Sequence, residues 1–496
     1  LYRRATGRRI MTLWSKLAGS GTKFFRDYIV LAGGQVIAKL LGFAAFAWLA
    51  RVLDPVDYGA VEYVVGLAVF FAMLVDGGLN VIGTRRVGRD PDELALLAFQ
   101  IPAARLLLAL AAVPLMMLIA TQLMKTTIPV ALVWLFALSL LITPWRQQWL
   151  FQATERMAAT AIADMLRMGV FAALIWTLVR APGDMLAVGW AEIAAVSAMT
   201  LYCLAVQHHR IARIRLRGSF AGFGALLREG AAVGSTNLVW ALNQYAPLFL
   251  IGALIGGVAT AWFAAASRIV TSLVTFSNLY HFNLYPSVAR NYARNDGSLG
   301  ILLARSLRVT GWGATFLALV LTVFATPIIR LALGPKLLDA APLLAVMAWM
   351  VPITIWSGHA RWGLAAAGAQ TRVLWSQCIG LATTVVLALA LGHAFGAIGY
   401  AIASLAGFVM VWASAHRFAR LWGCAPPSFR LVLPPLALAG AIIALNLLVP
   451  LSTLLALASV AAYAALAPLL DRKLIADIIL LGGTKRNYGT KESSSR

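Results

Sequence analysis

The sequence is poor in cysteine and in charged residues. Its three cysteines, Cys203, Cys378 and Cys424, are too widely spaced to form a CxxC metal or redox motif, and they imply no disulfide framework. Charged residues make up 12% of the chain and hydrophobic residues 61%, whereas about a quarter of the residues in a soluble domain are charged. This composition excludes an ordinary soluble protein.

Signatures of catalysis are also missing. The sequence has no GxxxxGK[ST] phosphate loop, so ATP hydrolysis is not expected. His208 and His209 are adjacent, whereas His281, His359 and His393 stand singly in or near apolar runs, and neither arrangement has the spacing of a zinc site. No loop is long enough to fold as a catalytic domain. We therefore expect no enzymatic activity, no metal and no cofactor.

Acidic residues are few, and the formal net charge is +23. Such an excess can indicate nucleic-acid binding, but here the basic residues lie in short loops between apolar runs, which is the pattern of a topology signal. The basic residues of the loops are unevenly divided, because the opposite set of loops holds little more than Arg51, Lys125, Arg180 and Lys336. The alternate loops hold Arg85, Arg86, Arg89, Arg156, Arg210, Arg213, Arg215, Arg217, Arg290, Arg294, Arg372, Arg417, Arg420 and Arg430. The positive-inside rule places these loops and both termini in the cytoplasm, and no nucleic-acid partner is expected.

Apolar runs of about 20 residues recur along the chain, and each is long enough to cross about 30 Å of hydrocarbon. They predict an all-α polytopic membrane protein with about 14 transmembrane helices. The expected spans are 28–50, 60–80, 97–122, 130–150, 159–180, 185–206, 228–254, 260–284, 305–330, 342–366, 373–393, 397–415, 431–449 and 452–470.

The spans group into two lobes of six helices, followed by a C-terminal pair. Because six is even, both lobes would enter the membrane from the same side, as in transporters whose halves are related by an axis along the membrane normal. The loop between the lobes alternates basic and apolar residues, which is typical of an amphipathic helix on anionic headgroups. The expected segments are a cytoplasmic basic leader (1–27), an N-lobe (28–206), an amphipathic connector (207–227), a C-lobe (228–416), a helix pair (417–470) and a disordered cytoplasmic tail (471–496).

Two basic residues fall near the middle of predicted spans. Lys39 lies about 11 residues into the first span, about 16 Å deep at 1.5 Å per residue, where its stem is too short to reach water. It either pairs with an acid such as Asp76 or Glu229, or it faces a cavity. Arg268 lies at a similar depth after small residues that permit close approach. If it lines a cavity, its guanidinium suits bidentate binding of phosphate.

Other polar residues also occur in or near the spans. The possible cavity residues are Asp76, Asn237, Asn243, Gln244, Tyr245, Asn278 and His281. Left in lipid they would be unsatisfied, so they are expected to face the interior, where they would form either a sugar-binding wall or hydrogen bonds between helices. Weaker candidates lie in or near spans, and many of them are close enough to a span end to reach the interface: Arg105, Arg146, Asp164, Arg167, Glu192 and Arg361.

Several short motifs resemble those of a known family. They are Lys39-Leu-Leu-Gly-Phe43, Ala50-Arg-Val-Leu53 followed by Tyr58-Gly59, Asp76-Gly-Gly-Leu79, Thr84-Arg85 and Trp149-Leu-Phe-Gln-Ala-Thr-Glu-Arg-Met157. Together they resemble bacterial polysaccharide-biosynthesis transporters, the O-antigen and exopolysaccharide repeat-unit flippases of the multidrug/oligosaccharidyl-lipid/polysaccharide (MOP) exporter superfamily. The predicted eighth span, from Ala264 through Arg268 to Tyr285-Pro286, resembles a helix of the related lipid II flippases.

This resemblance implies a MATE-like fold and an undecaprenyl-diphosphate-linked oligosaccharide as substrate, moved by alternating access across the bacterial inner membrane. It also implies that Lys39 and Arg268 line the central cavity, and it makes a glycan polymerase or glycosyltransferase complex a possible partner. Ala45 stands where lipid II flippases carry a second arginine, which favours the polysaccharide branch. The alternatives are a lipid II flippase, a MATE-type drug or cation exporter, for which acidic intramembrane residues would be expected, and a non-transporting membrane scaffold.

Overall fold

The computed structural model describes residues 33–122, 128–211, 218–448 and 453–483, together with residues 30 and 213. The predicted leader (1–27) and the second half of the predicted tail (484–496) lie outside these ranges, whereas residues 474–483 of that tail are helical. Throughout the described ranges the secondary structure is helical and there is no strand. The chain divides into two compact units, residues 1–238 (unit 1) and 239–496 (unit 2), and α9 contributes residues to both.

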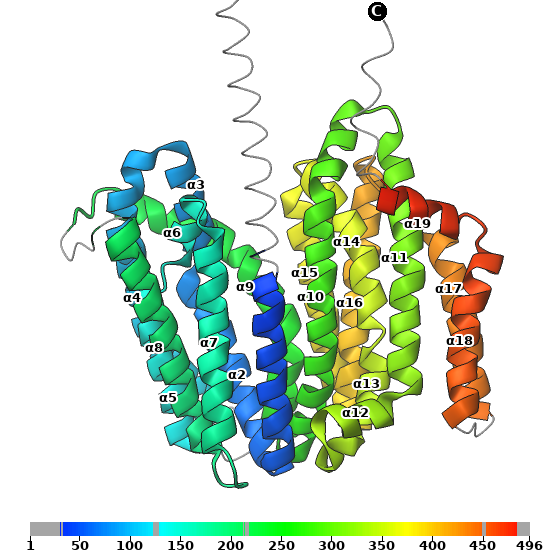
Figure 1. Ribbon diagram of the computed structural model, residues 1–496, viewed down its shortest axis with the longest axis horizontal. Helices are drawn as coiled ribbons and strands as arrows, with labels where there is room; N and C mark the ends of the chain where they lie inside the picture. The colour runs from blue at the N-terminus through cyan, green and yellow to red at the C-terminus, as the bar shows by residue number, and fades with distance from the viewer. Residues whose placement is uncertain are drawn as a thin grey trace, which may run out of the picture. The chain divides into compact units, whose positions relative to one another are not determined.

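Unit 1 begins with an apolar helix, Gly33–Val52. The helices that follow are α2 (Pro55–Asp76), α3 (Leu79–Arg89), η1 (Pro91–Glu93), α4 (Leu94–Gln122), α5 (Val130–Ile142), η2 (Thr143–Trp145), α6 (Gln148–Ala153), α7 (Met157–Leu178), α8 (Met185–Arg210) and the first half of α9 (Phe223–Leu254). In this unit α2 packs against α4 and α5, and α7 packs against α8 (Figure 1).

Unit 2 contains the second half of α9 and the helices after it. They are α10 (Gly257–Arg294), α11 (Ser298–Val323), α12 (Ala325–Leu333), η3 (Pro335–Ala340), α13 (Ala341–Met347), α14 (Met350–Ala366), α15 (Gln370–Phe395), α16 (Ala397–Leu421), α17 (Ser428–Leu448), α18 (Thr453–Leu470) and α19 (Leu474–Gly483). The centre of the unit is formed by α14, which packs against α10, α11 and α16.

Length and apolar character qualify twelve helices in the described ranges as membrane spans, and the bent pair α18–α19 makes a thirteenth if it is counted as one span. Within the described ranges each predicted span overlaps one helix or a broken helix. The 32-residue helix α9 is not among the twelve, because its middle carries Ser235, Thr236, Asn237, Asn243 and Gln244. The predicted fold class, an all-α polytopic membrane protein, is confirmed.

The second predicted span is broken near its end. Gly77 and Gly78 have φ of +51° and +74°, a left-handed conformation that glycine adopts without a steric penalty. They separate α2 from α3, and Gly78 packs directly on α9: a Cβ built there would lie 2.6 Å from the Gly230 carbonyl oxygen. Glycines on both sides therefore allow the break to touch the start of α9 backbone to backbone.

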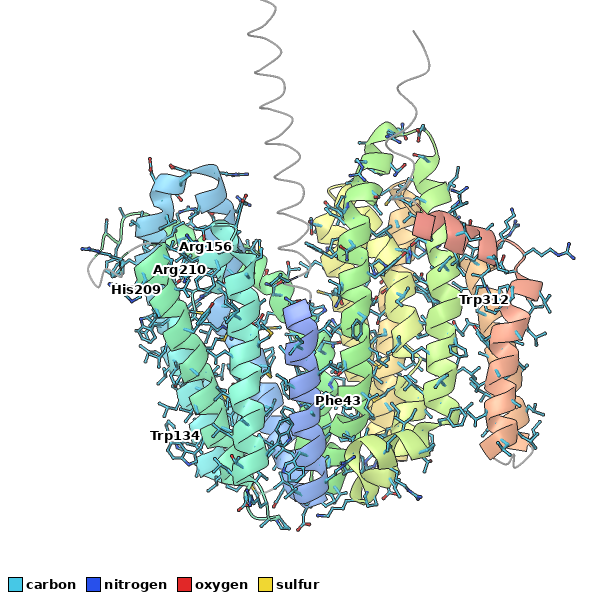
Figure 2. The ribbon with its side chains drawn as sticks, viewed as in Figure 1. Phe43, Trp134, Arg156, His209, Arg210 and Trp312 are labelled. Carbon is cyan, nitrogen blue, oxygen red and sulfur yellow. The ribbon has the colours of Figure 1, made fainter. Side chains whose placement is uncertain are left out.

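The ends of the helices in unit 1 fit the predicted order of the loops. Arg156, just before α7, donates a hydrogen bond to the Arg210 carbonyl at the end of α8, 2.9 Å away. Figure 2 shows these two residues and His209 together at one end of the unit, whereas Trp134 of α5 lies toward the opposite end and is 54% exposed. Two of the basic connections predicted to share one side of the membrane thus lie together.

The C-terminal helices are fastened to unit 2 by charged residues. Arg308 of α11 contacts Asp471 at 2.9 Å and also pairs with Asp477, and these acids flank the 90° bend between α18 and α19. Tyr463 of α18 stacks at a tilt on Trp312, with 5.5 Å between ring centroids. These contacts fix the position of the last helices on α11. The sequence alone predicts no role for these helices.

Candidate functional site

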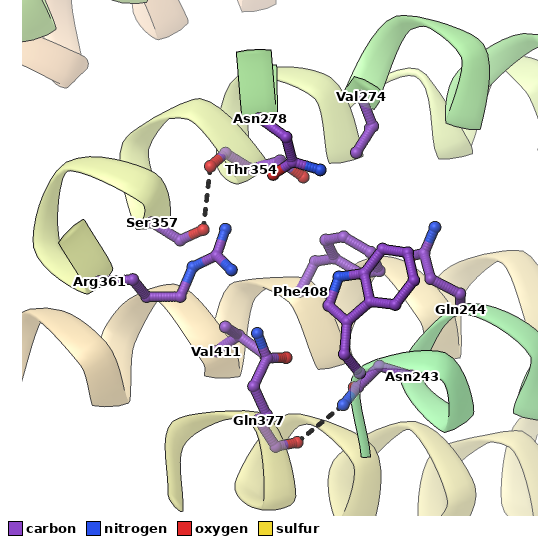
Figure 3. A pocket seen from close by; sticks show the side chains of 11 residues that line it. Asn243, Gln244, Val274, Asn278, Thr354, Ser357, Arg361, Gln377, Phe408 and Val411 are labelled. Carbon is purple, nitrogen blue, oxygen red and sulfur yellow. Dashed lines mark hydrogen bonds between the residues drawn. The ribbon is translucent and has the colours of Figure 1, made fainter. Parts of the chain in front are cut away.

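A polar pocket lies within unit 2, between α9, α10, α14, α15 and α16. Its lining residues are Trp240, Asn243, Gln244, Val274, Asn278, Thr354, Ser357, Arg361, Gln377, Phe408 and Val411 (Figure 3). The cavity volume is about 30 Å³, taken as the space open to the centre of a water molecule. The pocket in this conformation therefore has room for ordered water or a small polar group, and an oligosaccharide would need it to open.

Helical periodicity brings the polar side chains to one side of each helix. On α14, Thr354, Ser357 and Arg361 are three and four residues apart, which places them along one face. Val274 and Asn278 of α10 are four apart and share a face in the same way. The pocket is therefore assembled from short polar stripes on helices that are otherwise apolar.

Hydrogen bonds hold part of this lining in place. Asn243 Nδ2 donates to the Gln377 carbonyl at 3.0 Å and to the Val239 carbonyl at 3.2 Å. Ser357 Oγ donates to the Thr354 carbonyl at 3.0 Å. The first and the last of these bonds are the dashed lines of Figure 3. Asn243 thus joins α9 to α15 and forms a fixed part of the wall.

Arg361 differs from the other polar lining residues. Its guanidinium points into the pocket (Figure 3), and its buried Nε finds no hydrogen-bond partner among the described residues. A buried guanidinium nitrogen without an acceptor is costly. An anionic or hydroxyl-rich ligand would supply acceptors for it.

Three of the predicted cavity residues line this pocket: Asn243, Gln244 and Asn278. Arg361, which the sequence places among the weaker candidates, joins them. The sequence reasoning missed Trp240, Thr354, Ser357 and Gln377. The spacing of Thr354, Ser357 and Arg361 in the expected span 342–366 was the available signal.

Asn237, Tyr245 and His281 do not line the pocket. Asn237 is exposed and belongs to unit 1. Tyr245 is half-buried and stacks on Phe249, with the ring centroids 6.0 Å apart. His281 is 1% exposed and contacts His359 with its Nε2, 3.3 Å from the Nδ1 of that ring. Whether these residues meet substrate in another conformation stays a prediction.

The two predicted cavity cations lie in different units. Lys39 is exposed on the helix Gly33–Val52. Arg268 is half-buried on α10, where its carbonyl accepts a hydrogen bond from Ser272 Oγ at 2.7 Å. Their assignment as substrate-binding residues stays a prediction.

The acids considered as partners of Lys39 are each paired with an arginine of unit 1. Asp76 accepts a hydrogen bond from Arg105, and Glu229 accepts one from Arg86 at 2.9 Å. The ion pair with Arg105 neutralises Asp76, which lies where α2 ends at the glycine break. Ion pairs of this kind fix the positions of helices within unit 1.

Comparisons with known proteins identify relatives of the chain. A profile of the family described as "Polysaccharide biosynthesis protein" matches residues 24–292, more than half of the sequence. A protein of Escherichia coli (strain K12) named "Putative O-antigen transporter" is 21% identical over 332 residues, covering 65% of this chain and 78% of its own length.

Two solved structures have a similar fold. Lipid II flippase MurJ in an inward closed conformation superposes with a TM-score of 0.73 at 13% identity, covering 90% of this chain and 100% of its own. An inward-facing multidrug resistance MATE family transporter of the MOP superfamily superposes with a TM-score of 0.63 at 15% identity. The match covers 80% of this chain and 97% of that transporter. At these identities the likeness establishes a shared fold.

Proposed function

The chain belongs to the polysaccharide biosynthesis protein family, and from this premise we propose that it is a flippase for lipid-linked oligosaccharides. The cargo is an undecaprenyl-diphosphate-linked repeat unit of a surface polysaccharide such as O-antigen or exopolysaccharide. The protein carries the polar headgroup of this lipid from one face of the bacterial cytoplasmic membrane to the other by alternating access. It moves the molecule without changing a covalent bond, so we assign it no enzymatic step.

The observation that carries the proposal is the polar pocket inside the transporter fold. A charged pyrophosphate and a hydroxyl-rich glycan lose their hydration when they enter hydrocarbon. For an isolated ion this desolvation costs on the order of tens of kcal/mol. The pocket offers the amides of Asn278 and Gln377, the guanidinium of Arg361 and the indole of Trp240. Amides and a guanidinium replace hydration, and an aromatic face packs on a sugar ring.

We further propose that Lys39 and Arg268 bind the pyrophosphate. Basic residues inside membrane spans are costly and usually have a functional partner. A guanidinium binds phosphate oxygens in a bidentate manner, whereas an ammonium acts as a point charge. In this proposal the two cations bind the diphosphate and the pocket of unit 2 contacts the sugars.

The proposed orientation has both termini in the cytoplasm, as the distribution of basic loops predicts. Partners would then be the lipid substrate, the surrounding phospholipid and, on the outer face, a glycan polymerase or glycosyltransferase complex that consumes the delivered repeat unit.

Reconstitution tests the proposal directly. The purified protein is placed in phospholipid vesicles that contain a fluorescent undecaprenyl-diphosphate oligosaccharide, and translocation is followed by protection from a membrane-impermeant quencher. Parallel vesicles contain lipid II, and a third set contains a cationic dye. We expect translocation of the oligosaccharide lipid. Transport of the dye alone would overturn the proposal in favour of a drug exporter, and transport of lipid II alone would assign the other flippase class.

A further inference from the structure

A second polar cluster lies buried in unit 2, outside the pocket. It consists of Tyr280 and His281 on α10, Ser306 on α11 and His359 on α14, and we call it the histidine cluster. His281 is 1% exposed, and His359 and Ser306 are 0% exposed. The two imidazole rings meet edge to face with centroids 4.8 Å apart and planes at 84°. Two titratable rings in direct contact between spans are unusual, because buried polar groups in membrane helices are costly.

The hydrogen bonds assign a tautomer to each ring. His281 Nδ1 lies 2.7 Å from the Ser277 carbonyl, and His359 Nδ1 lies 2.8 Å from the Ile355 carbonyl. A carbonyl only accepts, so both Nδ1 atoms carry hydrogen. His281 Nε2 is then an acceptor, and the single hydrogen on His359 Nδ1, 3.3 Å away, is shared between this nitrogen and the Ile355 carbonyl. Both rings are satisfied in the neutral form.

A chain of hydroxyl groups leads to the remaining acceptor, His359 Nε2. Ser306 Oγ lies 2.7 Å from this nitrogen and therefore donates its hydrogen to it. Tyr280 Oη lies 2.6 Å from Ser306 Oγ, so it donates to the serine. Tyr280 is half-buried, whereas the groups behind it are fully buried. The chain thus runs in one direction, from the half-buried Tyr280 to the buried imidazole of His359.

A glycine of α14 leaves room for the His281 ring. Gly358 lies directly against the ring, and a Cβ built on this glycine would overlap the imidazole. An alanine at this position would separate the two histidines or displace α14. The close approach of the two rings therefore depends on a glycine next to His359.

Among the described residues no carboxylate hydrogen-bonds to either ring. Arg361 on α14 is two residues from His359 and points into the pocket. Further ionisable residues on the elements packed against α10 and α14 are Arg305, Arg308, Lys336, Asp339, Arg372, Cys378, His393, Tyr400, His416, Arg417 and Arg420. Within the described ranges none of these side chains hydrogen-bonds to the cluster. A proton on it would have no carboxylate to balance its charge, so the packing seen here favours neutral rings.

We propose that the histidine cluster is a proton-binding site that couples proton movement to transport. A proton arriving at Tyr280 Oη displaces the phenol hydrogen to Ser306 Oγ, and the serine hydrogen passes to His359 Nε2. The net change is one proton added to the imidazole, with the hydroxyls restored. The resulting imidazolium disfavours the present packing of α10, α11 and α14 and shifts unit 2 toward a conformation that hydrates the rings.

The inference rests on the proposed flippase function, and its test separates the two. Vesicles with the fluorescent oligosaccharide lipid are given a pH gradient while valinomycin and potassium hold the membrane potential at zero. We expect the gradient to raise the wild-type rate about tenfold over its rate at equal pH. Transport that ignores the gradient would overturn proton coupling and leave the flippase assignment intact. Failure to move the lipid under any condition would overturn the flippase assignment itself.

Two variants test whether the response of transport to the pH gradient depends on the histidine cluster. His359→Gln removes the proton acceptor, and Tyr280→Phe removes the entry hydroxyl while keeping the ring. Both should transport at equal pH and lose the acceleration by the gradient, so transport at equal pH shows that each variant is folded. His393→Gln, an exposed histidine of the same unit, is the matched control and should respond like the wild type. A gradient response retained in both Tyr280→Phe and His359→Gln would overturn the site.

Discussion

Arg105 donates hydrogen bonds from one Nη atom to Asp76 and, at 2.8 Å, to Asn80 Oδ1. These two acceptors lie on either side of the Gly77-Gly78 break, on α2 and α3. The other Nη atom donates to the Arg146 carbonyl at 3.2 Å. A single arginine of α4, only 4% exposed, therefore fixes the ends of two helices and the turn before α6.

Removing this arginine should destabilise unit 1. Arg105→Met would leave the Asp76 carboxylate partly buried without a partner, which costs about 3–5 kcal/mol. We expect a lower apparent melting temperature in detergent and less protein in the membrane. Arg85→Met removes an exposed arginine of α3 and is the control. The double variant Arg105→Met/Asp76→Asn should recover part of the loss. Equal effects of Arg85→Met and Arg105→Met would contradict the assigned role.

The contact between the glycine break and α9 gives a second prediction. A Cβ on Gly234 would lie 2.7 Å from the Gly77 carbonyl carbon and 2.9 Å from its oxygen. Gly234→Ala must therefore push backbone away from backbone, at a cost of about 1–3 kcal/mol. Gly224→Ala on the same helix meets nothing within 4 Å and should stay within about 0.5 kcal/mol of the wild type. Thermal unfolding in detergent compares the two, and equal melting temperatures would refute the close contact.

The number and position of the spans could be predicted from the sequence because apolar length is a local property. The breaks within the spans were less visible. The expected span 60–80 is two helices, since Gly77 and Gly78 take positive φ, and α19 turns 90° from α18 because Asp471 and Asp477 pair with Arg308. Both features depend on partners far away in the sequence.

The candidate site could be predicted only in part. Polarity within a span marked Asn243, Asn278 and His281 alike, but polarity does not reveal which neighbour a side chain meets. Asn278 lines the pocket, whereas His281, three residues further on, turns to His359 on α14. The sequence places Arg361 among the weaker candidates because it falls near the end of its predicted span. Arg361 lines the pocket because α14 packs against α10, and this packing cannot be read from the sequence.

The proposed cavity cations should be essential for export. A charge-assisted hydrogen bond contributes about 1.5–3 kcal/mol, so Lys39→Ala and Arg268→Ala should each reduce export of surface glycan about 10- to 100-fold with normal membrane insertion. Lys39→Arg preserves the charge and should retain part of the activity. Quantitative glycan staining in cells normalised for protein amount measures the effect. Normal surface glycan in both alanine variants would refute the assignment.

The topology can be tested by accessibility. In a variant with all three cysteines replaced, single cysteines at Arg213 and Arg294 should be shielded from an impermeant thiol reagent in intact cells. A cysteine at Arg180, exposed in the connection that the basic loops place on the opposite side, should be labelled. Permeabilised cells, in which all three positions should react, provide the control. The reverse pattern would invert the proposed orientation.

Arg361 offers the sharpest distinction between a structural and a binding role. If Arg361 were structural, Arg361→Ala would remove hydrogen bonds and lower the melting temperature. Its buried Nε is instead unsatisfied in the described part of the chain. Alanine should therefore leave stability unchanged or raise it, since it removes a half-buried charge whose Nε has no acceptor. The loss should fall on transport, about 10- to 100-fold for a lost charge-assisted hydrogen bond.

Arg361→Lys separates charge from geometry: it keeps the cation but loses the planar fork, and we expect an intermediate transport rate. Arg330→Ala, at an exposed arginine of α12, is the control and should transport normally. Vesicle translocation and thermal unfolding are measured on the same preparations. A fall in melting temperature that accounts for the lost transport would show that Arg361 supports the fold. Lost transport at full stability would place a ligand against its guanidinium.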